Sequence, residues 1–140
     1  MRNDPLPVDG YSKPTKKKTV LVVEDEAEIR GAVTEALEMH GYTVVPAANG
    51  QVALDLLRSN HLPDLILLDL TMPVKDGYTF RLEQTGDPRW GNIPVVTVTA
   101  DRDFVGRLER AGCSAYLQKP FELDELLAIV EKYCDYRGTA

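Results

Sequence analysis

The sequence has few cysteines, no long apolar run and no apolar segment at its start. Only two cysteines occur in 140 residues, and because Cys113 and Cys134 have no histidine or second cysteine nearby, they predict neither a zinc site nor a disulfide framework. The longest strongly apolar runs, such as 20–23 and 65–68, are far too short to span a membrane. The first residues lack the apolar segment of a secretory signal. We therefore expect a cytoplasmic protein with no membrane contact.

Positive charge is scarce beyond the first 18 residues. Residues 1–18 carry five basic and two acidic residues, whereas residues 19–140 carry 11 basic and 20 acidic residues, a net charge of −9. An acidic body repels phosphate, so direct binding of nucleic acid is disfavoured. The leading segment also contains three prolines and no periodic apolar pattern. We expect residues 1–18 to form a flexible tail.

From Thr19 onward, short apolar runs alternate with amphipathic segments. The runs predict strands at 19–24, 42–47, 65–68, 93–98 and 115–118. The segments between and after them predict helices at 29–41, 49–57, 76–84, 104–111 and 123–134, the first ending at Gly41 and the second capped by Asn49. Five such β–α units predict an α/β, flavodoxin-like (βα)5 fold. Its doubly wound, five-stranded parallel sheet would have the strand order 2-1-3-4-5. The length fits one domain, which we place at residues 19–136, with a C-terminal tail at 137–140.

Acidic residues follow two strands that this order makes neighbours. Glu24 and Asp25 follow the first strand, and Asp69 follows the third. Carboxylates held close together raise one another's pKa and cost stability unless a cation joins them. Oxygen ligands without nitrogen or sulfur favour Mg²⁺ or Mn²⁺. We therefore predict a metal site at this edge of the sheet. The alternative is that acids in this stretch, Glu26 and Glu28 among them, only stabilise the start of the following helix.

Asp69 has the setting of a nucleophile, because a rigid apolar strand would hold its carboxylate beside that cation. Such a carboxylate can accept a phosphoryl group as an aspartyl-phosphate. The hydroxyl of Thr99 and the ammonium of Lys119, at the ends of the fourth and fifth strands, would stabilise the charge on the transferring oxygens. Ala100 leaves room for a donor.

Four motifs in this order resemble the receiver (REC) domain of two-component response regulators. They are Val-Val-Glu24-Asp25-Glu26, Leu-Leu-Asp69-Leu-Thr-Met-Pro-x-x-Asp-Gly77, Val-Thr99-Ala100 and Tyr116-x-x-Lys119-Pro120-Phe121, and the resemblance covers residues 19–136. It implies that Asp69 is the phosphoacceptor and that Asp25 binds Mg²⁺ directly. Glu24 would act through a metal-bound water and Thr71 through its carbonyl. It also implies that Thr99 and Lys119 hold the phosphoryl oxygens, that Tyr116 is the switch aromatic moving with Thr99, and that the Lys119–Pro120 bond is cis.

The resemblance also implies partners. We expect phosphorylation by a sensor histidine kinase or a histidine phosphotransfer protein, and contact with a downstream protein that the sequence does not identify. A homodimer is left open. Because the sequence ends at Ala140, just after the last expected helix, we expect a stand-alone receiver. It would not be an enzyme beyond catalysing its own phosphorylation and dephosphorylation.

Three other functions suit the same fold class. A flavodoxin-like nucleotide or flavin binder needs a phosphate cradle after the first strand, but residues 24–28 there are mostly acidic and would repel a phosphate. A haloacid-dehalogenase-like phosphohydrolase also uses an aspartate nucleophile but needs a second aspartate two residues on, where Thr71 stands. A receiver acting only as a fixed scaffold is disfavoured by the intact set of acids.

Overall fold

The computed structural model describes residues 17–59, 62–69, 80, 83–84, 86–100 and 115–138. Residues 135–138 are described by their backbone alone. The strands are β1 (Thr19–Val23), β2 (Thr43–Ala47), β3 (Leu65–Asp69), β4 (Val95–Thr99) and β5 (Ala115–Gln118). Among the described residues, three helices have both ends defined: α1 (Ala27–Met39), α2 (Gly50–Arg58) and α5 (Leu123–Gly138). The last helix thus continues beyond residue 136, to Gly138.

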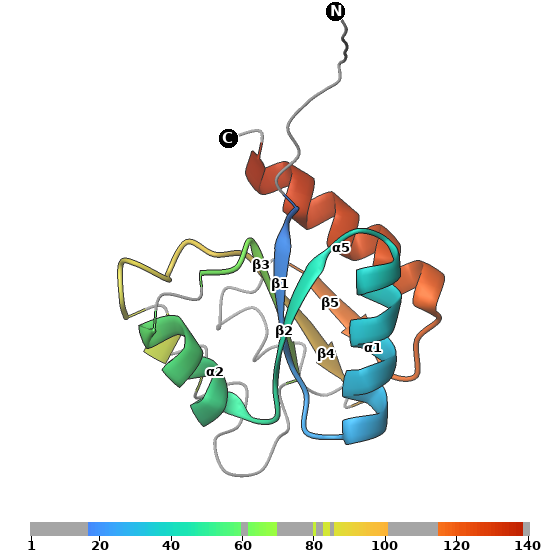
Figure 1. The fold of residues 1–140 in the computed structure, drawn as a ribbon, viewed down its shortest axis with the longest axis horizontal. Coiled ribbons are helices and arrows are strands. Elements are labelled where there is room, and N and C mark those ends of the chain that lie inside the picture. The colour runs from blue at the N-terminus through green and yellow to red at the C-terminus, as the bar shows by residue number, and fades with distance from the viewer. Residues whose placement is uncertain are drawn as a thin grey trace, which may run out of the picture.

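The five strands form one parallel sheet in the order β2-β1-β3-β4-β5, which confirms the predicted fold class and strand order. Figure 1 shows α2 on one side of the sheet and α1 and α5 on the other. Because β1 and β3 are direct neighbours, the chain crosses from one side of the sheet to the other at this point, where open α/β sheets place their functional sites.

The sheet is buried on both faces, so alternate residues of each strand belong to two separate cores. Val20 and Val22 of β1 pack with Val33 of α1 and Leu126 of α5, whereas Leu21 of β1 faces the other core. That second core contains the apolar side of α2 together with two aromatic residues, and its members include Ala53, Leu54, Leu57, Phe80 and Trp90. The alternation decides which residues at the strand ends can meet.

Two helices are bounded as their sequence predicts. Asn49 begins α2 by accepting a hydrogen bond from the Val52 N–H at 2.9 Å. After α1, Gly41 has a φ of +93°, a conformation that glycine adopts without a steric penalty. The N–H of Gly41 donates to Glu38 O at 3.1 Å, and that of Tyr42 donates to Leu37 O at 3.1 Å, so the last carbonyls of the helix are satisfied.

The edge strand β2 contains a proline. The N–H of Thr43 donates to Lys18 O at 2.9 Å, and Ala47 O accepts from the Glu24 N–H at 3.0 Å, so these residues face β1. Alternate residues of a strand direct their backbone groups to opposite sides. Val44 and Pro46 therefore face the open edge, and Pro46 costs the sheet no internal hydrogen bond.

Most predicted boundaries differ from the observed ones by one or two residues, whereas α5 extends four residues beyond its predicted end at 134. The sequence predicts a fourth strand from Ile93, but β4 begins at Val95, because the Ile93 N–H closes a turn onto Trp90 O at 3.1 Å. The helix predicted at 76–84 falls mostly outside the described residues, although Phe80, Glu83 and Gln84 are helical. The helix predicted at 104–111 lies wholly outside them. Among the described helices, none is long and apolar enough to cross a bilayer.

A buried amide holds the turn that leads into β4. The Gln84 side chain is fully buried, and its Nε2 donates to Trp90 O at 2.6 Å and reaches Ile93 O at 3.4 Å.

Replacing Gln84 with leucine leaves these carbonyls without that donor, so we expect a loss of about 1–3 kcal/mol in the free energy of unfolding. Urea denaturation measures it. The matched change Gln51→Leu, on the surface of α2, removes only a hydrogen bond to Asp55 and should cost less than about 0.5 kcal/mol. Equal losses in the two variants would contradict this role.

Candidate functional site

The polar residues of the site come from strands whose alternation places them on one face. Val22 and Leu67 belong to the core beneath α1 and α5, and Glu24 and Asp69 each lie two residues further along the same strands. Lys119 stands in the same relation to Leu117 of β5. The three side chains therefore converge at the carboxyl end of the sheet, as the sequence predicts, and Glu24 and Asp69 are 4% and 3% exposed.

Three carboxylates meet at this point. One oxygen from each of Glu24, Asp25 and Asp69 lies within 4.8 Å of the others. Two of these side chains are buried and Asp25 is partly exposed, so the cluster opens to solvent on one side. A set of oxygen donors at this spacing, with no nitrogen or sulfur ligand, fits a hard divalent cation such as Mg²⁺. The predicted carbonyl ligand, Thr71, lies outside the described residues.

The ammonium of Lys119 is the cation that faces these acids among the described residues. Its Nζ lies 3.0 Å from Glu24 Oε1, 3.3 Å from Asp69 Oδ2 and 3.7 Å from Glu26 Oε1. The Lys119 side chain is 15% exposed, so these contacts are formed largely away from water. From its position in the sequence, Glu26 is expected only to stabilise the start of the helix. It does occupy the N-cap of α1, but its side chain makes no capping hydrogen bond there and lies near Lys119 instead.

Burial shifts the proton equilibria of the site. Burial raises the pKa of Glu24 from 4.5 to about 7, and the charge of Asp69 adds to this, while hydrogen bonds from Lys119 and the Glu26 N–H act in the opposite direction. Burial alone would lower the pKa of Lys119. The hydrogen bond to Glu24 and the charges of Asp69 and Glu24 outweigh it, so the pKa of Lys119 lies above its usual value. Lys119 therefore stays charged at neutral pH.

The short segment between β1 and α1 is held by backbone and side-chain hydrogen bonds. The Glu26 N–H donates to Glu24 Oε2 at 3.1 Å, which orients that carboxylate. Arg30, one turn into α1, donates from Nη1 to Glu24 O at 2.8 Å and to Asp25 O at 3.3 Å. Nothing in the residue pattern singles out Arg30, because the feature that matters is its reach back to two carbonyls.

The remaining predicted residues lie on β4 and β5. Thr99 is buried at the end of β4, and its carbonyl accepts a hydrogen bond from the Lys119 N–H at 2.8 Å. Tyr116 pairs with Thr97 in the sheet. Because Thr97 and Thr99 are two residues apart on β4, Tyr116 lies on the same face of the sheet as Thr99. The Tyr116 side chain is 51% exposed, and Ala100 is also exposed. The Lys119–Pro120 bond is cis, which confirms the expectation from the resemblance.

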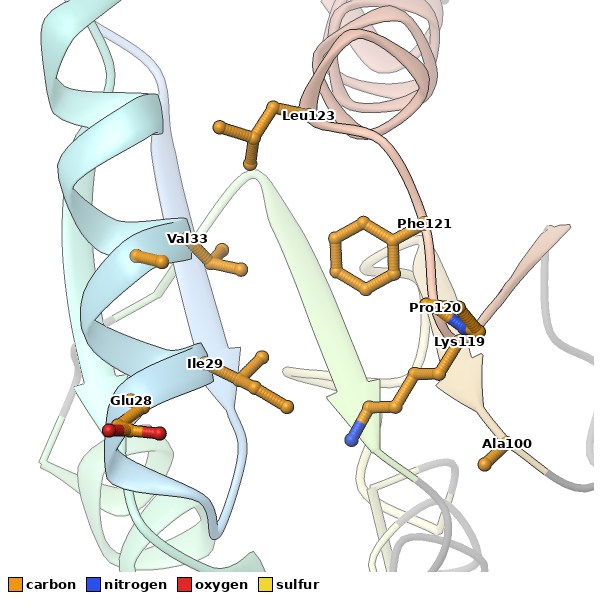
Figure 2. A pocket seen from close by; sticks show the side chains of 9 residues that line it. Glu28, Ile29, Val33, Ala100, Lys119, Pro120, Phe121 and Leu123 are labelled. Carbon is orange, nitrogen blue, oxygen red and sulfur yellow. The ribbon is translucent and has the colours of Figure 1, made fainter.

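An apolar pocket of about 440 Å³ adjoins the site. Figure 2 shows Ile29 and Val33 of α1 on one side of it and Phe121 and Leu123 on the other, with the Lys119 side chain extending along its edge. The pocket therefore lies beside the ammonium that contacts Asp69.

The sequence and fold were compared with known proteins. The family model of the response regulator receiver domain matches residues 20–131. The chain belongs to this family. The comparison thus confirms the recognition made from the four motifs and assigns the domain to phosphorelay signalling. The comparisons support neither a flavin or nucleotide binder nor a haloacid-dehalogenase-like hydrolase.

Individual relatives agree with this assignment. The receiver is 40% identical over 115 residues to the transcriptional regulatory protein PdtaR of Mycobacterium tuberculosis, covering 81% of this chain and 55% of PdtaR. The chain spans about half the length of the curated relatives it matches. Among solved structures, CheY4 of Vibrio cholerae is 28% identical with a TM-score of 0.79, over 84% of this chain and 99% of that one. The response regulator TrrA of Thermotoga maritima, solved in complex with Mg²⁺-BeF, is 32% identical with a TM-score of 0.74, over 83% and 98%.

The raised pKa of Glu24 predicts how the stability of the metal-free receiver depends on pH. Below about pH 4.5 Glu24 is protonated in both states, and above about pH 7 it is ionised in both, so its ionisation opposes folding increasingly between these values. We expect Glu24→Gln to remove a loss of up to about 3 kcal/mol across this range. Urea denaturation in chelator at several pH values measures the difference from wild type. The exposed residue Glu28 offers the control Glu28→Gln, and a Glu24→Gln profile parallel to wild type would contradict the prediction.

Proposed function

We propose that this receiver accepts a phosphoryl group on Asp69, in the presence of Mg²⁺, and signals through contact with other proteins. The observation that carries the proposal is the meeting of three carboxylates and one ammonium at the carboxyl ends of β1, β3 and β5. A buried carboxylate among other carboxylates is costly unless a cation binds there, and a receiver uses both the cation and the carboxylate. Residues 19–136 are the working unit in this proposal.

Glu24, Asp25 and Asp69 would hold Mg²⁺, or Mn²⁺ in its place, with the main-chain carbonyl of Thr71 as a further ligand. The donor set supports this, because the three carboxylate oxygens lie within 4.8 Å of one another. Glu24 is nearly as buried as Asp69 and would act through a water molecule bound to the cation. The cation, when bound, neutralises negative charge on the reacting oxygens.

The transfer itself uses the side chains of this chain. An oxygen of the Asp69 carboxylate forms a bond to phosphorus while the bond from phosphorus to the donor breaks, and the leaving group keeps that electron pair. Lys119 Nζ, 3.3 Å from Asp69 Oδ2, would bind an oxygen of the phosphoryl group carried by Asp69. The Thr99 hydroxyl, at the end of the adjacent strand, would bind a second oxygen.

The change in surface would follow from these contacts. A Thr99 side chain drawn toward the phosphoryl group leaves space on the face of β4 that it shares with Tyr116. Tyr116 is half-exposed and would turn inward to fill that space. The switch is therefore a local charge change that alters the exposure of one aromatic side chain.

The natural donor would be a phosphohistidine of a sensor histidine kinase or of a histidine phosphotransfer protein. The apolar pocket beside Lys119 supports a protein donor, since it offers Ile29, Phe121 and their neighbours as contact area next to the acceptor (Figure 2). A downstream protein, or a second copy of this chain, would then recognise the altered surface. We place these events in the cytoplasm, without contact to nucleic acid or membrane.

The test is phosphoryl uptake from acetyl phosphate. The receiver is incubated with the donor and with either Mg²⁺ or excess chelator, and intact-protein mass spectrometry measures the added phosphoryl group. We expect one group per chain with Mg²⁺ and none with chelator. Uptake that does not depend on the cation, or no uptake from acetyl phosphate or from phosphoramidate, would refute the proposal.

A further inference from the structure

Two backbone carbonyls at the site have no partner in either regular element that flanks them. β1 ends at Val23, and the Glu24 N–H donates the last hydrogen bond to β2, at Ala47 O. α1 begins at Ala27, and its first turn uses Glu26 O, which accepts from the Arg30 N–H at 2.9 Å. Glu24 O and Asp25 O lie between these two systems, and no backbone N–H among the described residues donates to either of them.

The side chain of Arg30 supplies the donors that these carbonyls need. Its Nη1 lies 2.8 Å from Glu24 O and 3.3 Å from Asp25 O. The same guanidinium nitrogen therefore spans the two residues that carry two of the three acidic side chains. A backbone carbonyl held in direction fixes the one peptide plane to which it belongs. Arg30 therefore holds the planes that follow Glu24 and Asp25, and the Glu24 N–H bond to Ala47 O holds the plane before Glu24. Both residues thus have fixed planes on their two sides, which sets the direction of their Cα–Cβ bonds.

We infer that Arg30 is a positioning residue for the metal site. It holds the backbone at Glu24 and Asp25 so that their carboxylates face Asp69, and it does so without touching the cation itself. This inference rests on the proposed binding of Mg²⁺. When a residue that orients metal ligands in this way is removed, metal affinity typically falls about 10- to 100-fold.

Electrostatics alone predicts the opposite sign for a change at Arg30. A guanidinium near a cation site repels the cation, so removal of its charge would tighten Mg²⁺ binding. Loss of positioning would weaken it. The direction of the change in affinity therefore separates the two effects. If Arg30 had no influence on the metal site, the Mg²⁺ affinity would not change in either direction.

The experiment measures Mg²⁺ affinity by calorimetry for the wild type, Arg30→Met, Arg30→Lys and Arg58→Met. Arg58 is a matched control because it is a half-exposed arginine on α2 that pairs with the surface acids Asp55 and Glu83. We expect affinity to fall about tenfold or more in Arg30→Met. Arg30→Lys keeps the charge, but the lysine side chain is shorter and its ammonium reaches the two carbonyls less well, so its loss should be intermediate. Arg58→Met should bind like the wild type.

A second readout does not depend on the cation. In chelator, amide hydrogen exchange at Glu26, whose N–H donates to Glu24 Oε2, should be faster in Arg30→Met than in the wild type and unchanged in Arg58→Met. If Arg30→Met does not fold, Arg30→Lys carries the test alone, and wild-type affinity in that variant overturns the inference. Unchanged or tighter binding in Arg30→Met also overturns it but leaves the proposed function standing. A wild-type protein that takes up no Mg²⁺ overturns both.

Discussion

Substitution of Asp69 with asparagine should abolish phosphoryl uptake. The asparagine has nearly the same shape and keeps one oxygen, but its amide nitrogen cannot attack phosphorus as a carboxylate oxygen does, and it removes one charge from the metal cluster. We expect no detectable added phosphoryl group, against one per chain in the wild type, under the same acetyl phosphate and Mg²⁺ concentrations. Intact-protein mass spectrometry followed by peptide mapping measures both the amount and the position.

The control for this substitution is Asp55→Asn on the exposed surface of α2, where the carboxylate contacts Gln51 and Arg58 and lies away from the site. It should take up phosphate like the wild type. The stability of Asp69→Asn should not fall in chelator, because the change removes one of several carboxylates that repel one another. Residual label on Asp69→Asn would mean that another residue is the acceptor, and the assignment of Asp69 would be wrong.

Removal of the Lys119 ammonium should have the largest effect on stability. Lys119 contacts two buried carboxylates, Glu24 and Asp69, at 3.0 and 3.3 Å, and no other cation faces them among the described residues. Loss of one partner of a buried ionic cluster leaves uncompensated charge and costs about 3–5 kcal/mol. We expect Lys119→Met to lose about 3 kcal/mol at about pH 8 in chelator, as urea denaturation measures.

The loss should depend on pH and on Mg²⁺. At about pH 6 Glu24 is largely protonated, so less charge is left unpaired and the loss should be smaller. Added Mg²⁺ should restore much of the stability, because the cation replaces the missing positive charge. Lys132→Met, which removes an exposed ammonium from α5, should change stability little under any of these conditions. A loss that is equal at both pH values would argue against the unpaired charges as its cause.

The fold could be predicted from the sequence because its pattern is simple and repeated. Apolar runs of four to six residues, such as 65–68, are separated by amphipathic segments, and the handedness of parallel connections then leaves few arrangements. The meeting of Glu24, Asp69 and Lys119 followed from the strand order, since the carboxyl ends of neighbouring parallel strands lie at one edge. The period of two along each strand explains why these side chains also share a face.

Other features of the site could not be predicted because they depend on where side chains reach. The sequence shows Glu26 as one more acid at a helix start, and only the geometry brings its carboxylate within 3.7 Å of Lys119. Arg30 is similar, since one turn of helix and a flexible side chain must be placed before its contact with two carbonyls is evident. The raised pKa of Glu24 depends on burial that a pattern of residue types does not quantify. The roles assigned to the site residues, those of Thr71 and Tyr116 included, stay predictions.

The proline in β2 affects how this molecule can associate. A strand at the margin of a sheet normally offers a row of donors to which a foreign strand can attach. Along β2 the backbone groups that point away from the sheet belong to Val44 and Pro46, and Pro46 has no N–H to offer. A strand of another molecule that paired with β2 would therefore find a backbone N–H donor at Val44 but none at Pro46. Self-association that begins at this side of the molecule is disfavoured, which protects the protein from aggregating through its own sheet.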